Sequence, residues 1–172
     1  AAEPGGRLPT PWPGTLADTP VSQVVPSTGV LSYTEGIHLG YRAWLRAGAP
    51  PAWPFGPGLG YTSWQVGELS ARVDGDSIVL DTTATNTGDR DGRTVVQFYA
   101  SRAESAIDRP VRWLVGWAEA TAAAGESVAL STRVALNTLA HWQDGWQLES
   151  GDVTITAASS VTDLHGSATI TI

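Results

Sequence analysis

The chain has 172 residues, a formal net charge of −7 and an apolar content of 42%. The negative charge argues against a nucleic-acid partner, and since all ten basic residues are arginines there is no lysine patch for an anionic surface. The length of 172 residues favours one globular domain with an appendage. No apolar run reaches the length of a membrane-spanning helix, so we expect no membrane partner.

Cysteine and methionine are both absent. Without cysteine the chain forms neither a disulfide nor a thiolate metal site, and the redox compartment stays open. Without an initiator methionine or a signal peptide at Ala1, we expect a processed or excised piece of a longer chain. A mature product left after propeptide removal is the alternative. The localisation is unknown, and a bacterial protein of this kind is either secreted or cytoplasmic.

The first 30 residues are rich in proline and glycine. Proline fixes φ and lacks an N–H, so this composition predicts extended chain lying on a surface. Residues 33–47 then place apolar side chains near helical spacing, although Gly36 and Gly40 each cost a helix about 1 kcal/mol. We predict a short helix or turn over residues 40–47.

Residues 52–64, AWPFGPGLGYTSW, contain two prolines, three glycines and four aromatic residues. This composition excludes regular helix and the centre of a sheet, and it is too aromatic for a flexible linker. We predict an ordered joint whose rings are buried against residues on both sides. These rings belong to Trp53, Phe55, Tyr61 and Trp64.

After this joint the apolar pattern changes to a period of two. Runs of β-branched residues alternate with turn signals such as Asp74-Gly75-Asp76. The predicted strands cover residues 64–73, 77–86, 94–100, 113–120, 127–136, 146–149, 153–158 and 168–172. Short strands at this spacing predict an all-β fold, a β-sandwich of the immunoglobulin or fibronectin type III kind, preceded by an extended, Pro/Gly-rich connector.

Seven short motifs follow one another along nearly the whole chain. They are GGRLPTPWP (5–13), YTEGIHLGYR (33–42), WPFGPGLGYTSW (53–64), TNTGD with VVQFY (85–89, 95–99), LVGW (114–117), AGE (124–126) and LAHW with WQLESG (139–142, 146–151). In this order they resemble the C-terminal part of glycoside hydrolase family 3 enzymes of the β-glucosidase type. The second is similar to the family's YxEGxxVGYR, and the third to its FPFGHGLSYTxF. Any one motif is weak, whereas seven in order are specific.

The resemblance implies a domain organisation. Residues 1–52 are the C-terminal end of an α/β-sandwich domain with its connector, 53–64 are an interdomain joint, and 65–172 are a fibronectin type III-like sandwich. Pro57 and Gly60 depart from the histidine or tyrosine and the serine usual in the joint. His141 and Gln143 stand where tyrosine and aspartate are common.

Enzymes of this family hydrolyse β-linked glucosides with retention, which requires a nucleophile and an acid/base carboxyl about 5–5.5 Å apart. The resemblance implies that both carboxyls lie on an N-terminal barrel and the α/β-sandwich, outside this sequence. We therefore expect no catalytic residue and no cofactor in this segment. Its role would be structural, stabilising the catalytic domains of the same enzyme, which bind the β-glucoside or oligosaccharide.

Glu35 and Arg42 lie in the one motif before the joint that is dense in polar and aromatic residues. In one interpretation they border the glucose pocket of the parent enzyme. In the other, which we favour, they form a structural ion pair or hydrogen-bond a loop.

Other candidate groups for chemistry are weaker. Two pairs of aspartates offer carboxylates to calcium, but they sit in ordinary turn sequences, and the isolated histidines lack zinc spacing, so we expect no metal site. These residues are Asp74, Asp76, Asp89, Asp91, His38, His141 and His165. Ser159, Asp163 and His165 come nearest to a Ser-His-Asp set, without an elbow motif.

The eight tryptophans leave a second function open. Indoles stack on sugar rings, so Trp113, Trp117, Trp142 and Trp146 are candidates for a carbohydrate-binding face. The competing interpretation is that they fill the core and the interface with the missing domains, and of these we favour the core. The other four are expected at an interface with missing domains, and they are Trp12, Trp44, Trp53 and Trp64. The alternative function is a free-standing carbohydrate-binding or adhesion module that uses exposed tryptophan.

Overall fold

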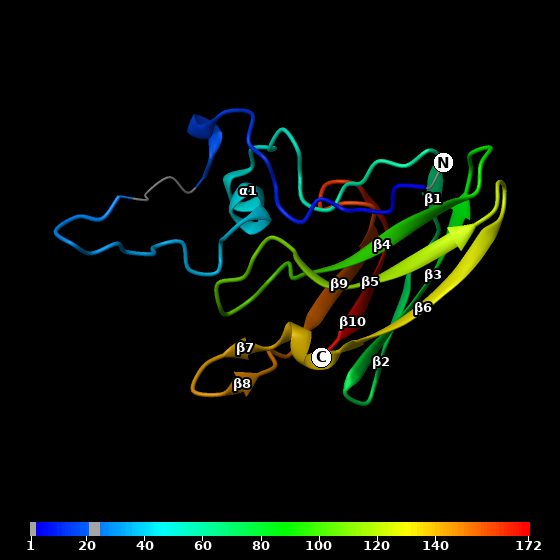
Figure 1. Cartoon of the computed structure of the whole chain (residues 1–172). Coiled ribbons are helices and arrows are strands. Elements are labelled where there is room, and N and C mark those ends of the chain that lie inside the picture. Colours follow the sequence, from blue (N-terminus) through cyan, green and yellow to red (C-terminus); the bar gives the residue numbers. More distant parts are fainter. Residues whose placement is uncertain (1–2, 21–24) are drawn as a thin grey trace.

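The computed structural model describes residues 3–20 and 25–172, and two antiparallel sheets packed face to face occupy its C-terminal two thirds (Figure 1). In the first sheet, β3 (Ser77–Asn86) pairs along its length with β6 (Ser127–Ala135). The other side of β3 pairs with β2 (Ser70–Asp74) and β1 (Trp64–Val66), which follow one another along it. The second sheet has the order β10 (Leu164–Thr171), β9 (Asp152–Ala158), β4 (Gly92–Ser101) and β5 (Trp113–Ala122).

The core lies between the sheets because their inner faces collect the apolar residues of each alternating strand. Strand β3 supplies Ile78, Leu80 and Ala84 at no exposure, while β4 supplies Phe98. The β2–β3 hairpin closes over Gly75 and Asp76, with Gly75 at φ +59, as the Asp-Gly turn signal predicts. The all-β sandwich predicted from the sequence is confirmed.

One predicted strand, residues 64–73, is two strands. Val66 pairs with Ala84 and Ser70 with Asp81, so three residues of the edge oppose two residues of β3. The extra residue forms a bulge at which the Gly67 N–H still donates to the Thr83 carbonyl at 2.9 Å.

The helical elements are short and lie outside the sheets. They are η1 (Leu16–Asp18), α1 (Tyr41–Ala47) and η2 (Leu136–Leu139). The predicted helix over residues 40–47 is therefore confirmed, with Gly40 preceding it and Gly48 ending it in the left-handed conformation. Among the described residues, no helix is long and apolar enough to cross a membrane.

Two features extend from the end of the sandwich that carries α1 (Figure 1). One is the small hairpin of β7 (His141–Trp142) and β8 (Trp146–Gln147), whose strands pair with each other and with no strand of the sandwich. The other is the chain that precedes α1, which reaches beyond the helix as an extended arm, residues 25–39.

Candidate functional site

The connector, residues 3–20 and 25–63, begins as irregular chain that pairs with the joint. Leu8 donates its N–H to the Pro57 carbonyl and accepts from Gly56 N–H, both at 2.9 Å. Trp12 and Trp53 exchange backbone hydrogen bonds of 2.8 and 3.1 Å. The two proline-rich stretches thus satisfy each other's backbone groups where neither can enter a regular sheet.

Gln97 on β4 fastens the joint to the outer face of the second sheet. Its side-chain Nε2 donates to the Gly56 carbonyl at 2.8 Å and to the Ser159 carbonyl at 2.9 Å, and its Oε1 accepts from the Tyr99 hydroxyl at 2.6 Å. Burial raises the pKa of Tyr99, so this hydroxyl remains a proton donor. The buried amide joins three segments and leaves none of its own hydrogens unpaired.

An aromatic cluster beside Gln97 holds α1 on the same face. The Tyr41 ring stacks on Phe55 at 4.7 Å between centroids and meets Tyr99 edge-on at 6.3 Å. The Tyr41 hydroxyl accepts the Leu114 N–H at 3.0 Å, and the Phe55 carbonyl accepts the Val161 N–H at 3.0 Å. Helix and joint therefore form one layer over the second sheet.

The far end of the joint is held by Asn86, which is fully buried at the end of β3. Its Nδ2 donates to the carbonyls of Arg90 at 2.7 Å and Ala122 at 3.1 Å. Its Oδ1 accepts from the Thr62 hydroxyl at 2.5 Å and the Gly88 N–H at 3.2 Å. The asparagine of the TNTGD motif therefore ties the joint to both turns at this end of the sandwich.

The burial expected for the four rings of the joint is only partly found. Phe55 and Trp64 are half-buried, but Trp53 is 59% and Tyr61 56% exposed, so the expectation is wrong for these two in this chain. Both are fixed through their backbones, Trp53 to Trp12 and Tyr61 to the Glu3 carboxylate, while the described chain leaves their rings uncovered. The assignment of these residues to an interdomain joint stays a prediction.

The four tryptophans after the joint also differ in how far they are buried. Trp113 is buried in the core and donates its indole N–H to the Thr138 carbonyl at 3.1 Å. Trp117, Trp142 and Trp146 are exposed, so the core role we favoured for them is wrong. Trp117 lies on the outer face of edge strand β5, and the other two lie on a hairpin outside both sheets. In the connector, Trp44 of α1 is buried within the chain itself.

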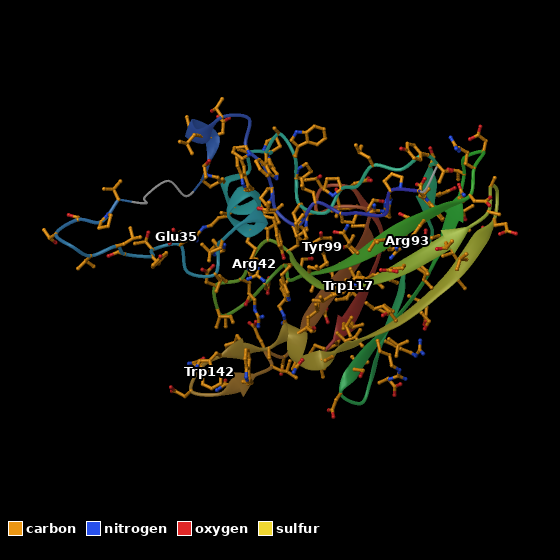
Figure 2. The ribbon with its side chains drawn as sticks, viewed as in Figure 1. Glu35, Arg42, Arg93, Tyr99, Trp117 and Trp142 are labelled. Carbon is orange, nitrogen blue, oxygen red and sulfur yellow. The ribbon has the colours of Figure 1, made fainter. Side chains whose placement is uncertain are left out.

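A groove of about 750 Å³ separates the connector from the β7–β8 hairpin. Its lining includes Ile37 and Arg42 on one side, Asp108 and Pro110 of the 101–110 loop, and the indoles of Trp142 and Trp146 on the other. Figure 2 shows Glu35, Arg42 and Trp142 at the same end of the molecule, away from Trp117 and Arg93.

Glu35 and Arg42 do not form the expected ion pair among the described residues. The Arg42 guanidinium lies 5.9 Å from the centroid of the Tyr41 ring, and Glu35 Oε2 is a buried oxygen with no hydrogen-bond partner in the described chain. The Glu35 backbone carbonyl accepts the His38 N–H at 3.0 Å, so this residue does help to shape its loop.

His38 anchors this loop to the sandwich, a contact that the motif analysis missed. The imidazole is buried, and its Nε2 lies 2.9 and 2.8 Å from the two carboxylate oxygens of Asp108. The two residues are 70 positions apart, and neither shows a pattern that pairs it with the other.

Glu149 fixes the 101–110 loop from the other side. Its carboxylate accepts from the Ala106 N–H at 2.6 Å, the Ser105 hydroxyl at 2.8 Å and the Arg109 guanidinium at 3.2 Å. The Ala106 and Ser105 hydrogen bonds lead in lowering the pKa of this carboxyl. The loop wall of the groove is thereby ordered by charge-assisted hydrogen bonds.

The nearest approach to a catalytic set has the wrong geometry. The Ser159 hydroxyl lies 2.7 Å from His165 Nε2, but Asp163 Oδ2 lies 3.9 Å from that same nitrogen. A relay needs the hydroxyl and the carboxylate on opposite nitrogens of the ring. Within residues 3–20 and 25–172, no group of three or more His, Cys, Asp or Glu side chains is placed to hold a metal ion.

Comparison with known proteins shows which domain class and which enzymes the chain is similar to. Residues 94–161 match the model of the fibronectin type III-like domain, the class that the two-sheet sandwich also defines. A β-glucosidase of Rhizobium radiobacter is 32% identical over 98% of the chain, and a probable β-glucosidase K of Emericella nidulans is 36% identical over 91%. The crystal structure of DesR, a β-glucosidase from Streptomyces venezuelae in complex with D-glucose, superposes over 99% of the chain with a TM-score of 0.91 at 30% identity.

The match covers only part of each relative: 22% and 19% of the two sequences and 23% of the DesR chain. This chain corresponds to the C-terminal, fibronectin type III-like region of glycoside hydrolase family 3 β-glucosidases, as its motifs predicted. In those relatives the region is one part of a larger polypeptide, and the catalytic domains lie outside it.

Proposed function

We propose that this chain is the domain-docking and stabilising segment of a β-glucosidase-like retaining glycoside hydrolase. The names of its relatives support the reaction class, and their greater length supports a division of labour in which other domains bind the β-glucoside and carry the catalytic carboxyls. The segment would hold those domains through its connector.

The distribution of exposed apolar residues is the observation that carries this proposal. Among the described residues, ten of the seventeen exposed large apolar side chains precede Trp64, and they are Trp12, Leu16, Val25, Val30, Tyr33, Ile37, Leu39, Trp53, Leu59 and Tyr61. Concentration of such residues marks a surface for another protein body. The connector is held on the sandwich by Gln97 and Tyr41, so it presents these side chains from a fixed support.

Glu35 and Arg42 are proposed to border the sugar pocket of the parent enzyme. The location of the two residues supports this, since Arg42 lines the groove at the connector end and Glu35 lies at the same end of the molecule (Figure 2). Exchange of each for alanine in the parent enzyme should raise KM for a β-glucoside if they touch the substrate. Unchanged KM with reduced stability would assign them a purely structural role.

Reconstitution tests the division of labour. Residues 1–172 are purified and assayed on an aryl β-glucoside, alone and together with the remaining domains of the parent polypeptide. We expect no turnover by the segment alone and gain of activity or stability on mixing. Turnover by residues 1–172 alone would refute the proposal.

A free-standing carbohydrate-binding module is the second candidate, favoured by the exposure of Trp117, Trp142 and Trp146. It predicts quenching or a shift of tryptophan fluorescence when the isolated chain is titrated with gluco-oligosaccharides. Flat titrations against several glucans would remove this candidate. The mass of the natural polypeptide also discriminates, because a product near 18 kDa favours a separate module.

A further inference from the structure

The β7–β8 hairpin is very short, yet it exposes two indoles. Its ladder consists of two residue pairs, His141 with Gln147 and Trp142 with Trp146. The indoles are 67% and 72% exposed and meet edge to face at 5.6 Å. The contact between them supports the hairpin, but most of both rings still faces outward, and so short a ladder is marginal by itself.

The groove beside this hairpin is lined by residues from two distant parts of the chain. One wall comes from the connector, at Ile37 and Arg42, and the opposite wall from the hairpin, roughly a hundred residues later in the sequence. Within the described residues, Arg42 has no ion pair, so the groove offers an available cation beside apolar surface. Ile37 continues directly into the exposed apolar residues of the arm.

We propose that this groove, which Trp142 and Trp146 line on one side, is a second docking surface for the remaining domains of the parent polypeptide. The proposal rests on the proposed function and adds to it that the sandwich itself, and not only the connector, holds the catalytic body. The matching surface would present an apolar side chain to the indoles and a carboxylate to Arg42.

The geometry favours a protein surface over a sugar. A saccharide platform offers a ring face on which the sugar lies flat, often extended by a second ring in the same plane. The planes of Trp142 and Trp146 are inclined by 84°, so the pair forms a corner and not a platform. A corner of two indoles accommodates an inserted side chain, as the aromatic anchors of protein interfaces do.

The test compares three variants of residues 1–172 for binding to the remaining domains of the parent, measured by biolayer interferometry without substrate. The double variant Trp142→Ala/Trp146→Ala should weaken Kd about 10- to 100-fold, as loss of central aromatic anchors does. Arg42→Glu should weaken Kd about tenfold or more by placing like charges together. Trp117→Ala, an equally large loss at an exposed indole away from the groove, should change Kd less than about threefold.

The outcomes separate the two proposals. If wild-type residues 1–172 fail to bind the remaining domains, the proposed function falls and this inference falls with it. If the wild type binds and both groove variants bind equally well, only this inference is overturned. A fluorescence titration of the isolated chain with gluco-oligosaccharides that responds in wild type and not in Trp142→Ala/Trp146→Ala would replace it with a sugar site. Thermal unfolding of each variant checks that the sandwich remains folded, and Arg42→Glu leaves the hairpin sequence unchanged.

Discussion

Gly56 and Gln97 are in contact at the point where the joint crosses the second sheet. The Gly56 carbonyl accepts the Gln97 Nε2 hydrogen bond at 2.8 Å, and Gly56 adopts φ +97. A Cβ at this position would collide with the Gln97 carboxamide, reaching within 3.0 Å of its Cδ. Glycine is therefore required for two reasons, a positive φ and a close approach to a buried amide.

Replacement of Gly56 by alanine should destabilise the chain by about 2 kcal/mol or more, since it combines backbone strain with displacement of a buried hydrogen-bonded amide. Urea unfolding followed by tryptophan fluorescence measures the loss. Gly6→Ala is the matched control, because a Cβ there meets nothing within 4 Å, and it should stay within about 0.5 kcal/mol of wild type. Equal effects of the two substitutions would contradict the structural role of Gly56.

Asn86→Asp should destabilise the chain by about 2–3 kcal/mol at neutral pH. The substitution keeps the shape but turns the donating Nδ2 into an oxygen that faces the carbonyls of Arg90 and Ala122. Since burial disfavours the charged carboxylate, the deficit relative to wild type should shrink as the pH falls and the carboxyl is protonated. Parallel urea titrations at pH 7 and pH 4 check this, and a deficit that stays constant with pH would show that Asn86 is not held between acceptors.

Tyr41→Phe and Tyr41→Ala should loosen the connector to different degrees. The first removes only the hydrogen bond from the Leu114 N–H, about 1 kcal/mol, whereas the second also removes the ring between Phe55 and Tyr99 and should cost about 2 kcal/mol or more. Hydrogen exchange should rise in residues 41–47 and 53–56 while β3 and β9 stay protected. Uniform loss of protection across the sandwich would contradict a separately docked connector.

Glu149 should make the stability of the chain sensitive to acid. Its pKa is lowered below the ordinary value of 4.5, chiefly by the Ala106 N–H and the Ser105 hydroxyl. A carboxyl with a lowered folded-state pKa contributes stability above its unfolded pKa, and that contribution is lost as the pH falls through the folded pKa. Glu149→Gln should therefore lower the thermal midpoint at pH 7 and make it fall less steeply below about pH 4.5.

Glu104→Gln is the control for this comparison, because Glu104 is exposed on the same loop. Its midpoint should follow the wild-type curve from pH 7 down to pH 3. If the thermal midpoint of Glu149→Gln falls as steeply at low pH as that of wild type, other carboxyls account for the acid sensitivity.

The strands were predictable because their signals are local. The predicted strand over residues 77–86 coincides with β3, and the turn at Asp74-Gly75-Asp76 closes the hairpin as expected. The alternation of apolar and polar residues and the preference of certain residues for turns both act over a few positions. They can therefore be recognised without knowing which strands pair. The break at Gly67 was missed because a bulge depends on the register with the neighbouring strand.

The motifs singled out Glu35, Arg42 and the joint, though not the contacts that these residues make. The joint was recognised as ordered, and Glu35 and Arg42 do lie at the groove end of the molecule. The His38 to Asp108 contact and the Gln97 amide that holds Gly56 join residues 70 and 41 positions apart. No periodicity connects such pairs, because only the closed sandwich brings their segments together.

The sequence by itself determined the all-β class, the positions of most strands and the ordered nature of the joint, since composition and the period of apolar residues act through the local backbone. The tertiary structure alone decided which indoles are covered. Trp113 and Trp117 are four residues apart on β5, yet the first lies in the core and the second faces outward. Between them β5 carries one extra residue, Val115, opposite the step from Phe98 to Tyr99 of β4, and this bulge shifts the register. Burial is a property of the surface that packs against a side chain, and that surface comes from residues distant in the sequence.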